Sequence, residues 1–289
     1  MIKKVSVIGA GKLGAALAFE LNRKNMLSYV LARSHSKKIA LSRAIEESKI
    51  ISSINELQVK ESDAIILAVQ DSAIKELAME LASFCKSDLK EKQIIHCSGK
   101  ERLSILDACK EMGASIAAAH PYQTFFKYDN EVFHQVPWLI EAEQYDEIAQ
   151  FIISLNGKPF QLTDLELEKK ALYHSSAVVA SNLLSSTIAL SKLILKEFES
   201  IAPSIIDKIV HTTDKNYLSP RNDEDFPITG PLVRGDLSTV AGHIEQLSYA
   251  PNLMKSYKAF SLATLEMLLH LNKITEENYN KAKIILEKE

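Results

Sequence analysis

A glycine-rich turn near the N-terminus constrains the fold more than any other feature of this sequence. The segment VSVIGAGKLGAALAFEL places Gly9, Gly11 and Gly14 in GxGxxG spacing, between a β-type run and a helical run. In that context the first glycine permits a tight turn, the second lets backbone approach a pyrophosphate, and the third lets helix and strand pack closely. The alternative is a turn that binds nothing, and the alternating pattern that follows argues against it.

Short apolar runs alternate with helical patterns through the first half of the chain. We expect strands at residues 4–8, 27–31, 64–69, 93–96, 115–119, 136–140 and 159–162. Continuous apolar strands separated by helices are typical of a mainly parallel sheet that is covered on both faces. The sequence therefore predicts an α/β, Rossmann-like domain over residues 1–160.

The pattern changes near residue 160, and an all-helical domain is expected over residues 161–289. The segment TDLE at 163–166 has the sequence of a capping box and can open a helix. Helical patterns cover residues 165–200, 205–218, 237–249, 251–271 and 276–286. Within the first of these helices, the apolar segments AVVA and NLL are expected to be buried.

Composition excludes several classes of function. The 289 residues suffice for two domains, and the formal net charge of −3 gives no electrostatic reason to bind nucleic acid or an anionic membrane. No apolar run of membrane-spanning length is recognised in the sequence. The three cysteines, Cys85, Cys97 and Cys109, form no CxxC pair, so neither a disulfide framework nor a zinc site is expected. A cytoplasmic setting fits this pattern.

The end of the second strand selects the expected cofactor. An NAD site usually places an acidic residue there, which accepts hydrogen bonds from the ribose hydroxyls. This chain has Arg33 nineteen residues after Gly14, followed by Ser34, and no acidic residue from 27 to 41. Arginine suits a 2′-phosphate through charge and planar hydrogen bonding. We therefore expect NADP(H) rather than NAD; the alternative is a solvated basic start of a helix.

Later strand ends complete the expected cofactor site, because ligands of open parallel sheets bind beyond the carboxyl ends of the strands. The segment AVQD ends one strand and HCSG ends another, where Ser-Gly leaves room for a nicotinamide ring. The expected cofactor-binding residues are Gly9, Ala10, Gly11, Lys12, Leu13, Gly14, Arg33, Ser34, Ala68, Val69, Gln70, Ser98 and Gly99. Cys97 is expected to serve packing rather than as a nucleophile, and His96 to be a partly buried histidine with internal partners.

The segment AAAHPYQTFF contains His120, for which three roles are considered: a core residue, a metal ligand or a group that transfers protons. Pro121 ends the strand and keeps His120 extended, so the imidazole is expected at the rim of the cleft. No HxH or HExxH spacing occurs, so no metal site is expected. A proton-handling role and a structural hydrogen bond to a loop carbonyl both remain open. Gln123, in the same segment, is a candidate for substrate binding.

Polar residues interrupt the first long helix of the second half. At 100° per residue, Lys170, His174, Ser181 and Ser185 fall on one stripe, with Asn182 on its flank. We expect His174, Ser181 and Asn182, together with His120, to act in catalysis. The alternative is close helix packing through the serines.

The later segment TGPLVRGDLSTVAGH adds further candidates. Arg234 can hold a substrate carboxylate in bidentate fashion, and His243 is a second candidate for substrate binding. Asp236 is expected to cap the helix that follows it.

Six segments in this order, GAGKLG, AVQD, HCSG, HPYQTF, YHSSAVVASNLL and TGPLVRGDLSTVAGH, together resemble one family. It is the family of NADP-dependent oxidoreductases in which a Rossmann-like domain precedes a helical domain of unknown function. In plan it is similar to ketopantoate reductase, pyrroline-5-carboxylate reductase and the β-hydroxyacid dehydrogenases. The resemblance implies a helical domain like the C-terminal domain of 6-phosphogluconate dehydrogenase, a cofactor between the domains and a homodimer formed through the helical domain.

The chain also departs from those better-known relatives. Ketopantoate reductase and the β-hydroxyacid dehydrogenases carry a catalytic Lys followed four residues later by Asn, whereas here Lys170 is followed by His174. The resemblance therefore implies an NADP-dependent reduction of a C=O or C=N bond in a small, carboxylate-bearing metabolite, without a specific activity. The alternative is a non-catalytic NADP(H)-binding sensor or a partner-binding protein.

Overall fold

The computed structural model describes residues 1–126, 128, 131–219 and 226–288. By packing, the chain divides into two compact units, Met1–Val178 and Val179–Glu289. The last strand of the sheet ends at Gln161, and helices follow it. The division by packing falls later, because the helix that starts at Lys170 buries this lysine within the first unit.

The first unit is built on one sheet of eight strands, and the mainly parallel Rossmann-like fold predicted from the sequence is confirmed. The strand order is β3-β2-β1-β4-β5-β6-β7-β8; neighbours are parallel except β6 and β7. The two-residue β3 is absent from the sequence prediction. The strands are β1 (Val5–Ile8), β2 (Leu27–Leu31), β3 (Ile50–Ile51), β4 (Ala64–Leu67), β5 (Gln93–His96), β6 (Ser115–Pro121), β7 (Pro137–Ala142) and β8 (Lys158–Gln161).

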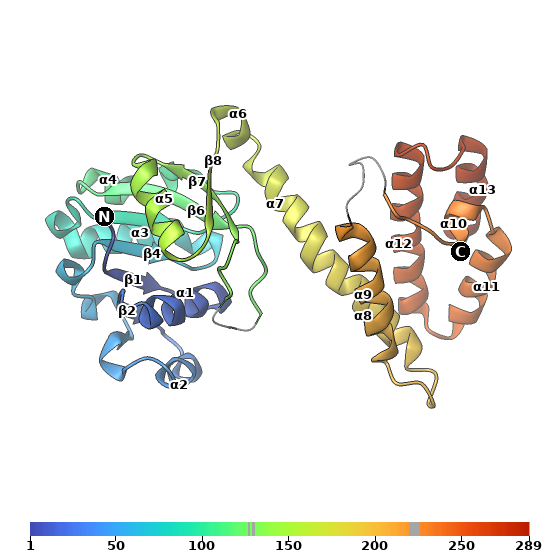
Figure 1. Ribbon diagram of the computed structural model, residues 1–289, viewed down its shortest axis with the longest axis horizontal. Helices are drawn as coiled ribbons and strands as arrows, with labels where there is room; N and C mark the ends of the chain where they lie inside the picture. Colours follow the sequence, from blue (N-terminus) through green and yellow to red (C-terminus); the bar gives the residue numbers. More distant parts are fainter. Residues whose placement is uncertain (127, 129–130, 220–225, 289) are drawn as a thin grey trace. The chain divides into compact units, whose positions relative to one another are not determined.

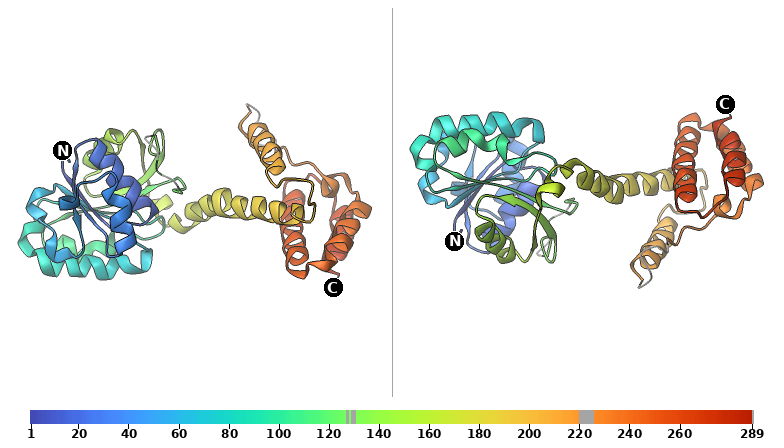
Figure 2. Two further views of the ribbon diagram at one scale, coloured as in Figure 1. Left: turned by 90° about the horizontal axis from the view of Figure 1, so that it is seen from below. Right: turned by 90° about the horizontal axis from the view of Figure 1, so that it is seen from above.

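Helices cover both faces of this sheet (Figures 1 and 2). α1 and α5 pack on one face and α3 and α4 on the other. The helices of the first unit are α1 (Lys12–Arg23), α2 (His35–Ser42), α3 (Asp71–Cys85), α4 (Asp107–Glu111), α5 (Tyr145–Ser154), α6 (Asp164–Leu167) and α7 (Lys170–Val178).

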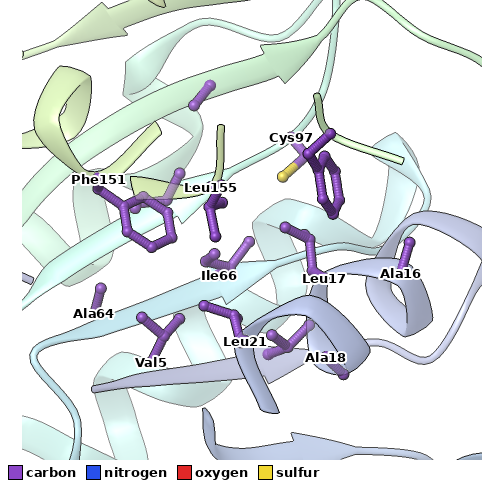
Figure 3. Close-up of a cluster of buried hydrophobic side chains, with 14 of the residues drawn as sticks. Val5, Ala16, Leu17, Ala18, Leu21, Ala64, Ile66, Cys97, Phe151 and Leu155 are labelled. Carbon is purple, nitrogen blue, oxygen red and sulfur yellow. The ribbon is translucent and has the colours of Figure 1, made fainter. Parts of the chain in front are cut away.

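Strand side chains alternate between the two faces, so each central strand contributes to two apolar cores. In β4, Ile66 joins the core under α1 and α5, whereas Ile65 joins the core under α3 and α4. Figure 3 shows the first core, in which Leu17 and Leu21 of α1 lie near Ile66. Burial on both faces explains why these strands are apolar throughout rather than alternating.

Pro121 is the last residue of β6, so the strand ends at this proline as expected, two residues beyond the expected range of 115–119. The register pairs Pro121 with Trp138 and His120 with Leu139 in β7, whereas β5 reaches only to Ala118. The missing N–H of Pro121 therefore costs no hydrogen bond in the ladder, because no strand lies on its other side. His120 is held in a paired, extended backbone at the end of the strand.

The second unit is helical. A π-helical segment, Val179–Leu183, follows α7, and the core is formed by α11, α12 and α13 with Val240, Leu265 and Leu268 fully buried. Figure 2 shows α12 and α13 side by side. Its helices are α8 (Leu184–Leu195), α9 (Ile205–Leu218), α10 (Pro231–Arg234), α11 (Leu237–Gln246), α12 (Pro251–His270) and α13 (Glu276–Glu287).

The expected burial of the AVVA and NLL segments is wrong for the single chain. Val179, Leu183 and Leu184 are each about half exposed. The helix Lys170–Leu195 is also long and apolar enough to meet the length and composition criteria for a membrane span, which the sequence analysis did not recognise. These criteria are weak evidence of a span, because apolar helices of soluble proteins meet them too.

Candidate functional site

The glycine turn between β1 and α1 has the close contacts that its spacing requires. Gly9 has a φ of +110°, and a Cβ there would lie 2.4 Å from the carbonyl oxygen of Ala68. A Cβ at Gly14 would lie 1.9 Å from the carbonyl oxygen of Gly9. Gly11, the residue before α1, would meet nothing within 4 Å. Two glycines thus close the turn, and the third leaves open space at the N-terminus of α1.

A cavity of about 320 Å³ opens beside this turn. We call it the glycine-turn cavity. Its lining comes from the turn itself, from the ends of β2 and β4, from the start of α2 and from one face of α3. The lining residues are Ile8, Gly9, Ala10, Gly11, Leu31, Arg33, Ser34, Lys37, Val69, Ala73, Glu76, Leu77 and Glu80.

The basic side of the glycine-turn cavity is formed by Arg33, Ser34 and Lys37. All three are exposed, and Ser34 is the residue immediately before α2. The structure thus brings Arg33 and Ser34, two of the expected cofactor-binding residues, to the wall of one cavity. An arginine, a hydroxyl and a lysine can together satisfy the oxygens of a phosphate group.

Lys12 and Leu13 do not line the glycine-turn cavity. The ammonium of Lys12 lies 4.1 Å from the centre of the Phe126 ring, and the lysine lines a separate cavity of about 280 Å³. Leu13 packs against the core. Of the three residues at the end of β4, Val69 lines the glycine-turn cavity, whereas Ala68 supports Gly9 and exposed Gln70 precedes α3.

A second polar region surrounds Gly99, beyond the end of β5. A Cβ at this buried glycine would lie 2.6 Å from Nδ1 of His174 and 3.0 Å from Nε2 of His120. The two imidazoles come from α7 and β6, and their centres are 5.6 Å apart in an edge-to-face arrangement. Tyr173 lies beside them, with its ring centre 5.8 Å from that of His120. We call Gly99, His120, Tyr173 and His174 the histidine pocket.

Three polar atoms of the histidine pocket are buried without a hydrogen-bond partner: Nδ1 of His120, Nδ1 of His174 and the hydroxyl of Tyr173. Buried polar groups nearly always have partners, so three such atoms in one region call for a partner that the described residues do not supply, such as a ligand. Both histidines were expected from the sequence. Tyr173 was not, although its position next to His174 on the same helix is a usable signal.

Burial keeps His120 and Tyr173 uncharged at pH 7. It lowers the pKa of His120 to about 4, and positive charge at His174 and Lys170 acts in the same direction. Burial likewise raises the pKa of the Tyr173 hydroxyl above its usual range. His120 is therefore neutral at pH 7, when it offers one N–H donor and one acceptor but no additional proton.

A buried ion pair anchors the helix that carries the pocket. The ammonium of Lys170 lies 3.2 Å from Glu141 of β7 and also donates to the carbonyl of Glu101. Glu141 accepts a second hydrogen bond from Arg102, at 2.8 Å. Burial lowers the pKa of Lys170, and the charge of Glu141 opposes this shift. Because His174 lies one turn after Lys170, this network fixes the position of His174 over Gly99.

The residues at the end of β5 are largely engaged within the fold. Ser98 accepts hydrogen bonds from the backbone N–H groups of residues 100 and 101 through its hydroxyl, so it shapes the turn that exposes Gly99. His96 accepts from the backbone N–H of Ser98 through Nδ1, and burial lowers its pKa to about 3. Its Nε2 has no partner among the described residues, so the expectation of a partly buried and fully satisfied histidine is wrong. Burial raises the pKa of the Cys97 thiol to about 12, far from the range of a nucleophilic thiolate.

Other expected site residues lie outside both regions. Gln123 is exposed and accepts from the backbone N–H of Thr124. Ser181 and Asn182 belong to the π-helical segment and bond to each other at 2.8 Å. A π-turn does not keep the 100° spacing, so it shifts the residues after Val178 off the predicted stripe. Ser185 is exposed.

The candidates of the second unit are Arg234 and His243. Arg234 is the exposed last residue of α10. His243 of α11 pairs with the hydroxyl of Tyr257 at 2.9 Å. Asp236 caps α11 by accepting from the backbone N–H of Thr239, as the sequence predicts. Among the described residues, no group of three His, Cys, Asp or Glu side chains is placed to hold a metal ion.

Comparisons with known proteins agree with this architecture. Residues 2–121 match the model of a Rossmann-like domain, and residues 136–264 match the model of a domain of unknown function, DUF2520. Both the fold and the family resemblance predicted from the sequence are thereby confirmed. A comparison with curated proteins finds no match.

Solved structures show the same fold at low identity. A candidate NADP oxidoreductase from Bacteroides fragilis is 22% identical, with 90% of this chain and 96% of that chain covered and a TM-score of 0.76. A reductive aminase from Aspergillus terreus, solved with NADPH and ethyl levulinate, is 15% identical over 97% and 98%, with a TM-score of 0.63. Pyrroline carboxylate reductase from Plasmodium falciparum, solved with NADP, is 14% identical over 98% of each chain, with a TM-score of 0.55.

Proposed function

Because this chain belongs to the proteins that join a Rossmann-like domain to a DUF2520 domain, we propose that it is an NADP(H)-dependent oxidoreductase. The reaction is reduction of a C=O or C=N bond in a small metabolite that carries a carboxylate. The observation that carries this proposal is the histidine pocket, in which His120, Tyr173 and His174 each bury a polar atom that has no partner among the described residues.

The glycine-turn cavity fits the adenosine end of NADP(H). Open space at Gly11 leaves room for a pyrophosphate against the first turn of α1. Arg33, Ser34 and Lys37 offer the donors and the positive charge that a 2′-phosphate requires. No acidic residue occupies the end of β2, where an NAD site would place one. These features favour NADP(H) over NAD.

The histidine pocket fits the reacting end of the site. Bound NADPH supplies a hydride to the carbonyl or imine carbon, and the oxygen or nitrogen then needs a proton. His120 is neutral at pH 7, so we assign it the donation of an N–H hydrogen bond. We assign the proton transfer to His174, whose Nδ1 faces Gly99 without a partner. The neutral hydroxyl of Tyr173 is a further donor.

The residues expected to bind substrate stay part of the proposal. We assign the substrate carboxylate to Arg234, because an exposed guanidinium can bind a carboxylate with two hydrogen bonds. Ser181 and Asn182 are assigned to orienting the substrate, and Gln123 and His243 to substrate contacts.

We also propose a homodimer formed through the helical unit. Leu184 and Leu193 of α8 and Ile205 and Ile209 of α9 are exposed apolar side chains in the single chain. A second copy of the chain would bury these apolar side chains in a dimer interface. Light scattering on the purified protein is expected to give twice the 32.2 kDa mass of one chain.

Turnover with NADPH on a panel of keto acids and cyclic imines tests the proposed reaction. His174→Ala is expected to lower kcat by about 10²- to 10⁴-fold, the usual contribution of a positioned acid, with the Kd for NADPH unchanged. Ser175→Ala is the matched control, because this exposed hydroxyl donates to the carbonyl of Leu172 in its own helix.

Two results would count against this proposal. Unchanged turnover in His174→Ala would remove the assigned role of His174. Tight NADPH binding without hydride transfer to any compound of the panel would favour a non-catalytic sensor instead.

A further inference from the structure

The wall of the glycine-turn cavity opposite Arg33 carries negative charge. Glu76 and Glu80 of α3 both line the cavity, and a carboxylate oxygen of Glu80 lies 3.6 Å from the guanidinium of Arg33. The sequence places no acidic residue at the end of β2. The structure brings a carboxylate to the same place from another element.

Helical spacing explains how α3 supplies both apolar and negatively charged side chains to the lining of the glycine-turn cavity. Ala73, Glu76, Leu77 and Glu80 are spaced by three, one and three residues, which places them on one face of the helix. Ala73 and Leu77 form an apolar surface, and the two carboxylates extend from its edge.

The Arg33–Glu80 pair contributes little to folding. The side chain of Arg33 is 71% exposed and that of Glu80 is 49% exposed, and ion pairs of such exposure add little to stability. The pair matters more for an anion that enters the cavity. A phosphate needs the donors of Arg33 that face Glu80, and it also meets the negative charge of Glu80 directly.

Glu80 has a different effect on a ribose with free hydroxyls, as in NADH. This ribose is uncharged, so Glu80 does not repel it, and a carboxylate can accept hydrogen bonds from its hydroxyls. One side chain therefore acts in opposite directions on phosphorylated and unphosphorylated dinucleotides.

We propose that Glu80 weakens the preference of this protein for NADPH by competing with the 2′-phosphate of NADPH for Arg33. Glu80 narrows the difference in affinity between NADPH and NADH. This role rests on the proposed function, because it assumes that the glycine-turn cavity holds the adenosine end of the dinucleotide.

Binding titrations with NADPH and NADH, followed by nicotinamide fluorescence, test this role without any need for a substrate. Glu80→Gln keeps the size of the side chain and removes its charge. The Kd for NADPH is expected to fall by about threefold to tenfold, as for the loss of one nearby like charge near a surface. The Kd for NADH is expected to stay the same or to rise.

Two matched variants separate this role from a general effect of charge. Asp88→Asn removes a similarly exposed carboxylate, paired with Lys60 at 3.7 Å, and should change neither Kd. In an Arg33→Ala background, Glu80→Gln should have a smaller effect on NADPH, because the competition for the guanidinium is gone. Raising the salt concentration should shrink the gain in Glu80→Gln.

The outcomes separate the two proposals. If the wild-type protein binds neither dinucleotide, the proposed function fails. If it binds NADPH and Glu80→Gln leaves that Kd unchanged, or shifts the Kd values for NADPH and NADH equally, only the role of Glu80 is overturned.

Discussion

The glycine-turn cavity and the histidine pocket differ in how their polar groups are satisfied. Arg33 and Glu80 in the cavity are exposed, charged and paired with each other. His120, Tyr173 and His174 in the pocket are largely withdrawn from solvent, and each has a buried atom without a partner. The glycine-turn cavity therefore presents charged groups to solvent, whereas the histidine pocket presents neutral hydrogen-bonding groups that are shielded from solvent.

This difference indicates what each region can do for a ligand. An exposed ion pair exchanges its partner for the charge of a ligand at little cost to the fold, so the cavity suits binding and selectivity. Buried atoms without partners gain hydrogen bonds only when a ligand arrives, so the pocket suits chemistry on a bound group.

The largest expected difference in stability is between two charge-removing substitutions, one at Glu141 in the ion pair that anchors the helix of the histidine pocket and one at Glu80 in the glycine-turn cavity. Glu141→Gln leaves the buried ammonium of Lys170 without its carboxylate, and the free energy of unfolding should fall by about 3 kcal/mol. Glu80→Gln removes an exposed pair and should change it by less than about 1 kcal/mol. Urea denaturation at pH 7 measures both. Equal effects would remove the distinction between a buried anchor and an exposed pair.

The next largest contrast is expected between two glycine substitutions, one in the histidine pocket and one in the glycine turn. Gly99→Ala forces His174 and His120 to move, and such overpacking should lower the free energy of unfolding by about 1–3 kcal/mol. Gly11→Ala adds a methyl group in open space, so stability should stay unchanged while the affinity for NADPH falls. Thermal unfolding and dinucleotide titration of both variants provide the readouts. Full stability and full turnover in Gly99→Ala would argue against the histidine pocket.

The smallest expected effect is a pH dependence specific to the pocket. The pKa of His120 is about 4 in the folded protein and about 6.5 when unfolded, so the unfolded chain binds more protons between these values. The stability that the fold gains from a neutral, buried His120 is fully present above pH 6.5 and is lost as the pH falls towards 4. Between pH 7 and 5.5, His120 should account for a loss of about 1 kcal/mol.

Replacement of His120 checks that assignment. His120→Gln should show a smaller loss of stability on acidification, whereas His134→Gln, at an exposed histidine of the same unit, should behave like the wild-type protein. The same loss in His120→Gln and the wild type would show that His120 is not held neutral by burial.

The glycine-turn cavity was the more predictable of the two regions. Gly9, Gly11, Gly14 and Arg33 occupy fixed positions relative to two strand ends, so local sequence places them. Glu80 was missed because it reaches the cavity from α3, and its spacing from Ala73 and Leu77 has meaning only when the cavity is known.

The histidine pocket depends on packing that the sequence does not encode locally. His120 and His174 were recognised as unusual polar residues in apolar segments, but their common neighbour Gly99 was assigned to the cofactor alone. The pairing of Lys170 with Glu141 joins a helix to a strand 29 residues earlier, and no periodicity marks it. The π-turn at Val179–Leu183 shifts the predicted stripe, and the apolar segments within and beside it are exposed in the single chain.

The central claim is that one dinucleotide is bound by the glycine-turn cavity and reaches the histidine pocket. Nuclear magnetic resonance of protein with ¹⁵N-labelled histidines, titrated with NADP⁺ and with 2′-phospho-ADP-ribose, tests this claim most directly. The second compound keeps the phosphates and lacks the nicotinamide. We expect both compounds to bind, and only NADP⁺ to shift the ring nitrogen signals of His120 and His174. If NADP⁺ binds and leaves those signals unchanged, the histidine pocket is not the reacting end of the site.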